Sequence, residues 1–222
     1  METTQIIVLP GLDGTDLLLD RFREYAPPAF EMAIASLPDN PDDDYVTLCD
    51  YLSARIRNLD SCHIVAQSFS GPLAILLAHR HPDIVHRLTL VASFATSPIP
   101  FIGRFLPWSL LFRLPMPSLM ARRFFVGADS SIIPALKNAI RQTSPPTLVQ
   151  RIHCLMNVDV TSHLSELDCA LTYIRPTQDR LVSKSAVNTI VGVNKSVVVR
   201  EIDGPHLILQ TRPKQAWASI LR

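Results

Sequence analysis

The chain has 222 residues, 47% of them hydrophobic, and its 21 basic and 20 acidic residues leave a formal net charge of +1. This length suits one domain with a sizeable core, and the balanced charge gives no general argument for binding nucleic acid. The longest apolar stretch, residues 99–112, is interrupted by Pro100, Arg104 and Pro107 and is too broken to span a bilayer. We therefore expect a globular protein without a transmembrane segment.

The start of the chain and its cysteines predict a compartment. Residues 1–4 contain no basic residue and lead into a predicted strand, not into the apolar core of a signal peptide. The four cysteines form neither a CxxC pair nor a Cys/His group with zinc spacing, which favours buried, reduced thiols: Cys49, Cys62, Cys154 and Cys169. Both observations predict a cytoplasmic protein.

The first sixty residues alternate between strand and helix signals. Residues 5–9 are apolar and typical of a buried strand, and the glycines of the following loop, residues 10–15, permit a tight turn. Asp16 is a good N-cap for a helix over residues 17–25. The pattern then predicts a strand over residues 31–37, an acidic loop over 38–44 and an amphipathic helix over 45–58.

A third strand leads directly into a serine. The β-branched residues Ile64 and Val65 precede Ser68, and a helix rich in Leu and Ala follows over residues 72–81. Strand, small residues, serine and helix form the context of a nucleophile elbow, whose consensus has glycine where this chain has Ala66 and Ser70. A serine in an ordinary strand-to-helix loop is the alternative interpretation of these residues alone.

The second half of the chain interrupts this alternation and then resumes it. After a strand over residues 86–92, the stretch 97–158 lacks strand signals and indicates several short helices inserted as a lid. Alternation resumes with strands over 169–174 and 196–202, a helix over 183–191 and a final helix ending at 221. The pattern predicts an α/β fold with a mostly parallel sheet between helices, built from residues 1–96 and 159–222, with residues 97–158 as the inserted helical lid.

Three polar residues follow predicted strands in the order Ser68, Asp179, His206. Because chemistry in an open parallel sheet gathers at the carboxyl ends of the strands, we expect these side chains to meet. Serine needs a base such as histidine, and the histidine needs a carboxylate that fixes its tautomer. No Asp or Glu follows the strand that ends near Ala92, which leaves Asp179 as the natural acid; Asp203 is expected to serve loop structure.

These motifs resemble those of the α/β-hydrolases over nearly the whole chain outside the lid. The acid loop corresponds to residues 179–182 and the histidine loop to 204–206, and Pro10-Gly11-Leu12 stands where the family carries His-Gly-X. The resemblance implies that the backbone amides of Leu12 and Phe69 form the oxyanion hole. The chain departs from the family at Pro10 and at the elbow, and it lacks the family's usual first two strands, which predicts a sheet of six.

The residues and the resemblance together predict a serine hydrolase of carboxylic esters or thioesters. Ser68 would form an acyl-enzyme, Asp179 and His206 would complete the triad, and no metal or other cofactor is expected. Two alternatives remain open. One is an acyltransferase of the same fold, and the other is a ligand-binding protein or receptor that keeps the triad but turns over poorly.

The predicted lid, residues 97–158, differs in charge from the rest of the chain. It holds seven basic residues and one acidic residue and so carries about +6, whereas the remaining 14 basic and 19 acidic residues give about −5. We expect Trp108 and Phe112 to line an acyl pocket, and Arg122 and Arg123 to contact the substrate.

A basic, apolar lid is similar to that of the esterases that cut pimeloyl-acyl carrier protein methyl ester in biotin synthesis. The similarity implies an acidic acyl carrier protein or a phosphorylated carrier as the partner that presents the acyl group. Arginines that only solvate short helices, or that face an anionic membrane surface, are the alternatives.

Overall fold

A computed structural model describes residues 5–222; the prediction made from residues 1–4 lies outside this range. Six parallel strands form one sheet in the order β2-β1-β3-β4-β5-β6, which confirms the predicted α/β class and the number of strands. The strands are β1 (Gln5–Leu9), β2 (Met32–Ile34), β3 (Cys62–Gln67), β4 (Val85–Val91), β5 (Ala170–Pro176) and β6 (Val198–Ile202).

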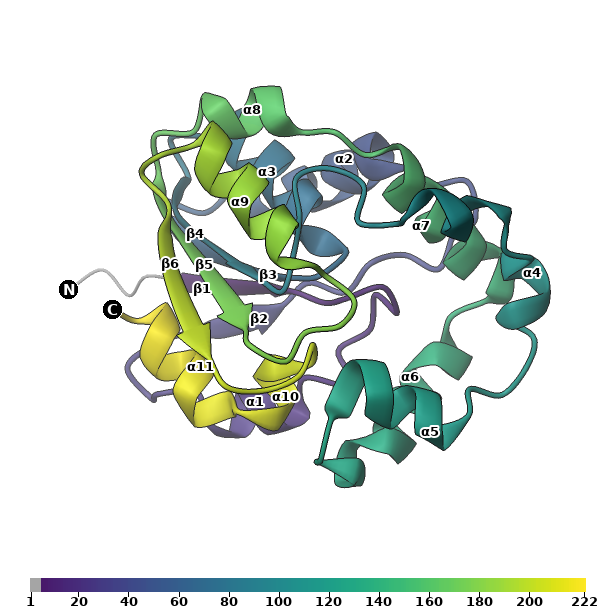
Figure 1. Cartoon of the computed structure of the whole chain (residues 1–222). Helices are drawn as coiled ribbons and strands as arrows, with labels where there is room; N and C mark the ends of the chain where they lie inside the picture. Colours follow the sequence, from purple (N-terminus) through teal and green to yellow (C-terminus); the bar gives the residue numbers. More distant parts are fainter. Residues whose placement is uncertain (1–4) are drawn as a thin grey trace.

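Helices cover both faces of the sheet (Figure 1). One face packs against α2 (Tyr45–Ile56), α3 (Ser70–Arg80), α8 (Thr161–Ser165) and α9 (Lys184–Val193). The other packs against α1 (Asp20–Glu24), α10 (Ile208–Thr211) and α11 (Pro213–Ile220). Every residue of β3 is buried, as expected for a strand with neighbours on both sides and helices on both faces.

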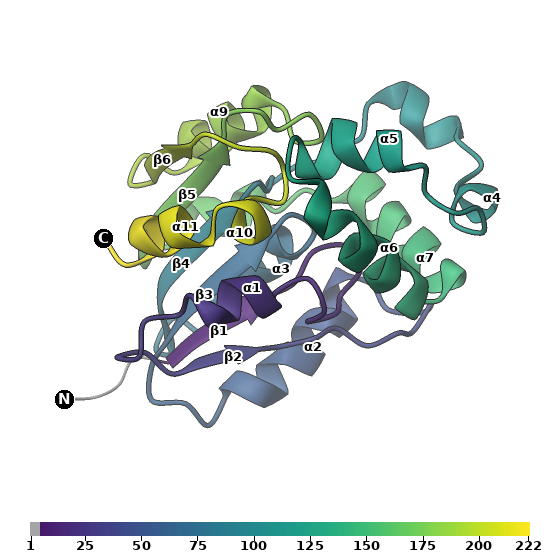
Figure 2. The ribbon, with the colours of Figure 1, turned by 90° about the horizontal axis from the view of Figure 1, so that it is seen from below.

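The segment between β4 and β5 contains a series of short helices. They are η1 (Phe101–Phe105), α4 (Trp108–Leu111), α5 (Ser118–Ala121), η2 (Arg122–Val126), η3 (Ser130–Ile132), α6 (Ile133–Gln142) and α7 (Pro145–Asn157). Figures 1 and 2 show these helices beyond the carboxyl ends of the strands. An isolated antiparallel bridge between Thr96 and Asp159 joins the two ends of the segment, which we call the insert, residues 97–158.

Two predicted helices, one near each end of the chain, differ from the prediction. The first helix begins at Asp20 and its N-cap is Leu19 without a side-chain cap, so the prediction of Asp16 as N-cap was wrong. Residues 15–18 lie in turns, because the Asp13 carboxylate accepts hydrogen bonds from Thr15 and bends the chain there. The final helix divides into α10 and α11 at Pro213, which has no N–H to continue the helical ladder.

The second strand is shorter than the predicted range 31–37. It ends at Ile34, and Leu37 donates its backbone N–H to the Gly14 carbonyl at 2.8 Å instead of continuing along β1. The chain therefore leaves the sheet edge to support the loop after β1.

No helix within residues 5–222 is long and apolar enough to cross a membrane. The four cysteine thiols are free, three of them buried and Cys169 half-buried.

Candidate active site

Ser68 occupies a strained turn between β3 and α3. Its φ of +51° lies in the left-handed region that residues with a side chain rarely adopt. The Ser68 carbonyl accepts hydrogen bonds from Gly71 N at 3.1 Å and from Ser93 Oγ at 2.7 Å, which hold the turn. A Cβ at Gly71 would lie 1.8 Å from Ser93 Oγ, so this elbow requires glycine one position after Ser70.

Ser68, His206 and Asp179 form one continuous hydrogen-bonded chain. His206 Nε2 lies 3.0 Å from Ser68 Oγ, and His206 Nδ1 lies 2.8 Å from Asp179 Oδ2. The histidine and aspartate side chains are each only 4% exposed. Since a carboxylate at Nδ1 favours the tautomer protonated there, Nε2 is left to accept the serine proton.

Backbone amides hold the Asp179 carboxylate in place. Its Oδ1 accepts hydrogen bonds from Leu181 N at 2.8 Å and Val182 N at 3.0 Å, and Oδ2 faces the histidine. Asp203 instead accepts from Thr177 Oγ1 at 2.7 Å and Gln178 Nε2 at 3.0 Å, and these two hydrogen bonds lower its pKa. Asp203 thus ties the loop after β6 to the loop after β5.

The loop after β1 carries the amide of Leu12, one of the two predicted oxyanion donors. A turn closed by Gly14 N and the Gly11 carbonyl at 3.0 Å shapes this loop, and Ser70 Oγ donates to the Pro10 carbonyl at 2.5 Å. Serine at this elbow position therefore links the elbow to the loop, a contact that the consensus glycine lacks. Within residues 5–222, no protein acceptor is found for the backbone N–H of Leu12 or of Phe69.

Solved structures of other proteins have a similar fold over nearly the whole length of this chain. A hydrolase from Pseudomonas aeruginosa PA01 has a TM-score of 0.82 at 13% identity, with coverage of 99% of this chain and 89% of that one. The enol-lactonase from Burkholderia xenovorans LB400 has a TM-score of 0.80 at 15% identity, with coverage of 100% and 91%. The chain has the α/β-hydrolase fold.

Comparison by sequence reaches less of the chain. No family model matches it. A curated relative, "sn-1-specific diacylglycerol lipase ABHD11" from Mus musculus, is 30% identical over 141 residues. The match covers 59% of this chain and 45% of the relative, so the chain spans less than half the length of that protein.

Within this α/β-hydrolase fold, two side chains of the insert hold the loop after β1. Arg151, on α7, donates from Nη1 to the Leu12 carbonyl and from Nη2 to the Pro38 carbonyl, both at 2.8 Å. Thr143 Oγ1 donates to the Asp13 carbonyl at 2.6 Å. The sequence analysis counted Arg151 among the charges of the lid, but the residue is 2% exposed and anchors the loop.

The surroundings of Arg151 explain other features of this loop. A Cβ at Gly14, whose φ is +70°, would lie 2.5 Å from Arg151 Nη1, so the guanidinium and the backbone conformation both require glycine. The guanidinium also lies over the Phe69 ring, 5.9 Å from its centroid. Burial raises the pKa of the Asp13 carboxyl, against the opposing effects of its Thr15 hydrogen bonds and the Arg151 charge. Chain position gives no signal for Arg151, because its partners are more than a hundred residues away.

The insert also contacts the loop that carries His206. The Phe125 ring meets the His206 ring edge-on, with 6.2 Å between centroids, and the Phe125 carbonyl accepts from Leu207 N at 3.0 Å. A Cβ at Gly127 would lie 3.4 Å from Pro205 Cβ, so η2 ends close against the histidine loop.

The four residues predicted to bind substrate fall into two groups. Trp108 and Phe112 stack with 6.0 Å between ring centroids, and both are half-buried against the large core cluster on the α3 face. Arg122 and Arg123 are exposed on η2, with the Arg123 guanidinium over the Phe124 ring. Phe112 lines a cavity of the insert whose lining does not include Arg122 or Arg123.

Within residues 5–222, no group of three or more His, Cys, Asp or Glu residues has the arrangement to hold a metal ion.

Proposed function

We propose that this protein is a serine hydrolase of carboxylic esters or thioesters. The observation that carries the proposal is the hydrogen-bonded chain from Ser68 Oγ through His206 to Asp179, with the serine on a strained turn of an α/β-hydrolase fold. The mouse relative, whose name describes a lipase, also supports the proposal. So does a solved carboxylesterase from Nitrososphaera gargenis, which has a TM-score of 0.81 at 15% identity and covers 99% of this chain and 89% of that one.

The proposed acylation step uses the geometry directly. His206 Nε2 takes the proton of Ser68 Oγ as the oxygen attacks the acyl carbonyl carbon, and Asp179 stabilises the imidazolium that forms. The carbonyl oxygen becomes an oxyanion, which the amides of Leu12 and Phe69 stabilise by hydrogen bonds. Collapse of the tetrahedral intermediate expels the alcohol or thiol, which leaves with the proton returned by His206.

Deacylation repeats these roles with water as the nucleophile. His206 takes a proton from water, the hydroxyl oxygen attacks the acyl carbon, and the Ser68 oxygen leaves and regains a proton. The products are a carboxylic acid and the free serine. An alcohol or amine in place of that water would give acyl transfer.

The test of this proposal removes the nucleophile. Ser68→Ala should lower turnover of a p-nitrophenyl ester by several orders of magnitude, because no other group can form the acyl-enzyme, while the melting temperature stays within a few degrees. A serine-directed fluorophosphonate should label Ser68 in the wild type, as read by peptide mass spectrometry. Substantial activity in a folded Ser68→Ala protein would refute the triad.

The same assay separates a hydrolase from a binding protein that keeps the triad. A working esterase should release p-nitrophenol at a steady rate over many turnovers. One equivalent released in a burst, followed by no further release, would favour the binding protein.

For the natural substrate, we propose an acyl group presented on an acidic carrier, such as pimeloyl-acyl carrier protein methyl ester. The supporting observation is the excess of positive charge on the insert. Arg122 and Arg123 are both exposed, and none of the ion pairs within residues 5–222 includes them. An acidic partner would be attracted to such a surface at low salt.

The carrier proposal is tested by reversing this charge. Arg122→Glu with Arg123→Glu should lower kcat/KM for a carrier-linked ester at least tenfold at low salt and change that of p-nitrophenyl butyrate less than twofold. Equal effects on both substrates would contradict it. Preferential hydrolysis of diacylglycerol in an ester panel would instead favour a diacylglycerol lipase activity, as in the name of the mouse relative.

A further inference from the structure

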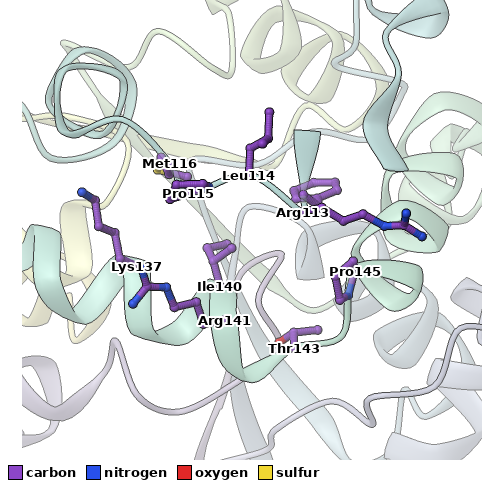
Figure 3. Close-up of a pocket in the computed structure, with 10 residues that line it drawn as sticks. Arg113, Leu114, Pro115, Met116, Lys137, Ile140, Arg141, Thr143 and Pro145 are labelled. Carbon is purple, nitrogen blue, oxygen red and sulfur yellow. The ribbon is translucent and has the colours of Figure 1, made fainter. Parts of the chain in front are cut away.

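The insert contains a cavity of about 510 Å³ whose walls all come from the insert itself. One wall is the connection from α4 to α5, residues 112–116, and the opposite wall is α6 with the start of α7 (Figure 3). The volume falls in the range of about 300–1,000 Å³ that is usual for small-molecule sites. The cavity therefore has room for a ligand and not only for ordered water.

The charged side chains around this cavity are all basic. Arg113, Lys137 and Arg141 line it, and its lining contains no Asp or Glu. Figure 3 shows Lys137 and Arg141 on one side of the cavity and Arg113 on the other. None of the ion pairs within residues 5–222 involves these three side chains, although Lys137 Nζ donates to Ser118 Oγ at 2.8 Å. The cavity therefore carries positive charge that the protein itself does not neutralise.

The remaining lining is largely apolar. Phe112, Met116 and Ile140 are half-buried and contribute hydrocarbon or ring surface, and the stems of the basic residues extend this surface. A ligand that suits such a site combines an apolar chain with an anionic group. A neutral ester would leave the three charges without partners, and a small inorganic ion would leave the apolar surface uncovered.

Two lining residues of the cavity are linked to the loops of the candidate active site. Thr143 lines it, and the same side chain donates to the Asp13 carbonyl in the loop that carries Leu12. On the other side, Met116 packs against a cluster that contains Leu207, the residue after His206. The walls of the cavity are thus connected to both loops, directly through Thr143 and through a shared hydrophobic cluster at Met116.

We propose that this cavity is the binding site for an anionic group, a carboxylate or a phosphate, at the end of an apolar portion of the substrate. The proposal rests on the ester hydrolase function proposed above and names its substrate class, esters of anionic amphiphiles. Arg113, Lys137 and Arg141 hold the anion, and Phe112, Met116 and Ile140 hold the chain. The three basic residues differ from Arg122 and Arg123, which do not line the cavity.

The first experiment measures binding without turnover. Octyl phosphate, octanoate and octanol are titrated into Ser68→Ala protein by calorimetry, below their micellar concentrations. Both anions should bind at least tenfold more tightly than octanol. The difference in affinity between octyl phosphate and octanoate shows whether the cavity prefers a phosphate or a carboxylate. Equal binding of all three would overturn the proposal, and this outcome is independent of whether the protein is a hydrolase.

Two charge-removal variants localise the site. Lys137→Gln with Arg141→Gln should weaken octyl phosphate at least tenfold. The matched control, Arg57→Gln with Lys214→Gln, removes one Arg and one Lys charge from exposed positions outside the cavity and should weaken it less than twofold. Equal weakening by both variants would show that overall charge, and not this cavity, attracts the anion.

The second experiment tests whether the cavity makes the protein prefer ester substrates that carry an anionic group at the end of the acyl chain. Two substrates with six acyl carbons each are compared, the p-nitrophenyl monoester of adipic acid and p-nitrophenyl hexanoate. The acyl chain of the first ends in a carboxylate, and that of the second ends in a methyl group. The wild type should prefer the adipate ester in kcat/KM, and Lys137→Gln with Arg141→Gln should lower that preference at least fivefold. An unchanged preference would overturn the assignment of the cavity. Hydrolysis of both esters that persists in the Ser68→Ala variant would instead refute the proposed function.

Discussion

The two regions around the candidate active site differ in how deeply their residues are buried. In the sheet, all six residues of β3 are buried, and the strand ends directly at Ser68. In the insert, α4 has no buried residue, and Ile102 and Leu119 are each 79% exposed. The proposed nucleophile thus follows the more deeply buried region, as expected where geometry must be held within a fraction of an ångström.

The insert nevertheless reaches the site through a few inward-facing residues. Arg151 and Thr143 hold the loop of Leu12, and Phe125 contacts His206. On the proposed function, the sheet would position the groups that react, whereas the insert holds one flanking loop and would select the substrate. Substitutions in the two regions should therefore have separable effects.

The largest effect is expected for the carboxylate supplied by the sheet region. Asp179→Asn should lower kcat by roughly 10³ to 10⁴, because an amide at Nδ1 favours the wrong histidine tautomer. The matched control is Asp203→Asn, since Asp203 bonds Thr177 and Gln178 and not the histidine, and it should change kcat less than tenfold. Steady-state kinetics with both variants decides the assignment, and a reversed order of effects would mean that Asp203 is the acid.

A smaller effect is expected for the insert residue that holds the loop. Arg151→Met should lower kcat about 10- to 100-fold with KM nearly unchanged, because the Leu12 peptide loses its anchor. It should also lower the free energy of unfolding by about 2–4 kcal/mol, since two carbonyls lose their donor in a buried site. Kinetics and urea unfolding of the same preparation measure both quantities.

The control for Arg151 is another arginine of the insert. Arg104 donates to the Met156 carbonyl, away from the loop after β1, so Arg104→Met should leave kcat within threefold. If Arg151→Met changed stability but not kcat, the guanidinium would serve only the packing of α7. The insert would then have no effect on catalysis through the loop that carries Leu12.

The smallest effect concerns stability in the sheet, remote from the chemistry. His63 near the start of β3 is buried with Nε2 2.8 Å from Thr89 Oγ1, and burial, aided by the Arg87 charge, lowers its pKa to about 4. The unfolded chain therefore binds more protons than the folded one between about pH 4 and 6.5, so stability falls as the pH is lowered through this window.

At pH 5 the loss from His63 should be about 2 kcal/mol relative to pH 7.5. Urea unfolding at the two pH values, compared with His63→Gln, measures it. Equal pH dependence of the wild type and the variant would show that His63 does not carry the effect.

The sequence by itself predicted the alternation of strands and helices, a helical segment over residues 97–158 and the chain order of Ser68, Asp179 and His206. These features were readable because hydrophobic period and loop residues are local, and because parallel strands bring their carboxyl ends to one edge. The six-stranded sheet followed from the same local signals. The roles of the three residues remain a prediction that the hydrogen-bond geometry supports.

Only the tertiary structure decided which charged residue of the insert is buried. Seven basic residues of this segment have similar local surroundings, yet Arg151 alone finds carbonyls at Leu12 and Pro38, 139 and 113 residues away in sequence. The same holds for Asp16, whose capping role failed because the Asp13 turn places residues 15–18 outside the helix. A buried charge is stable only where distant parts of the chain supply its partners, and no local pattern records where those partners will be.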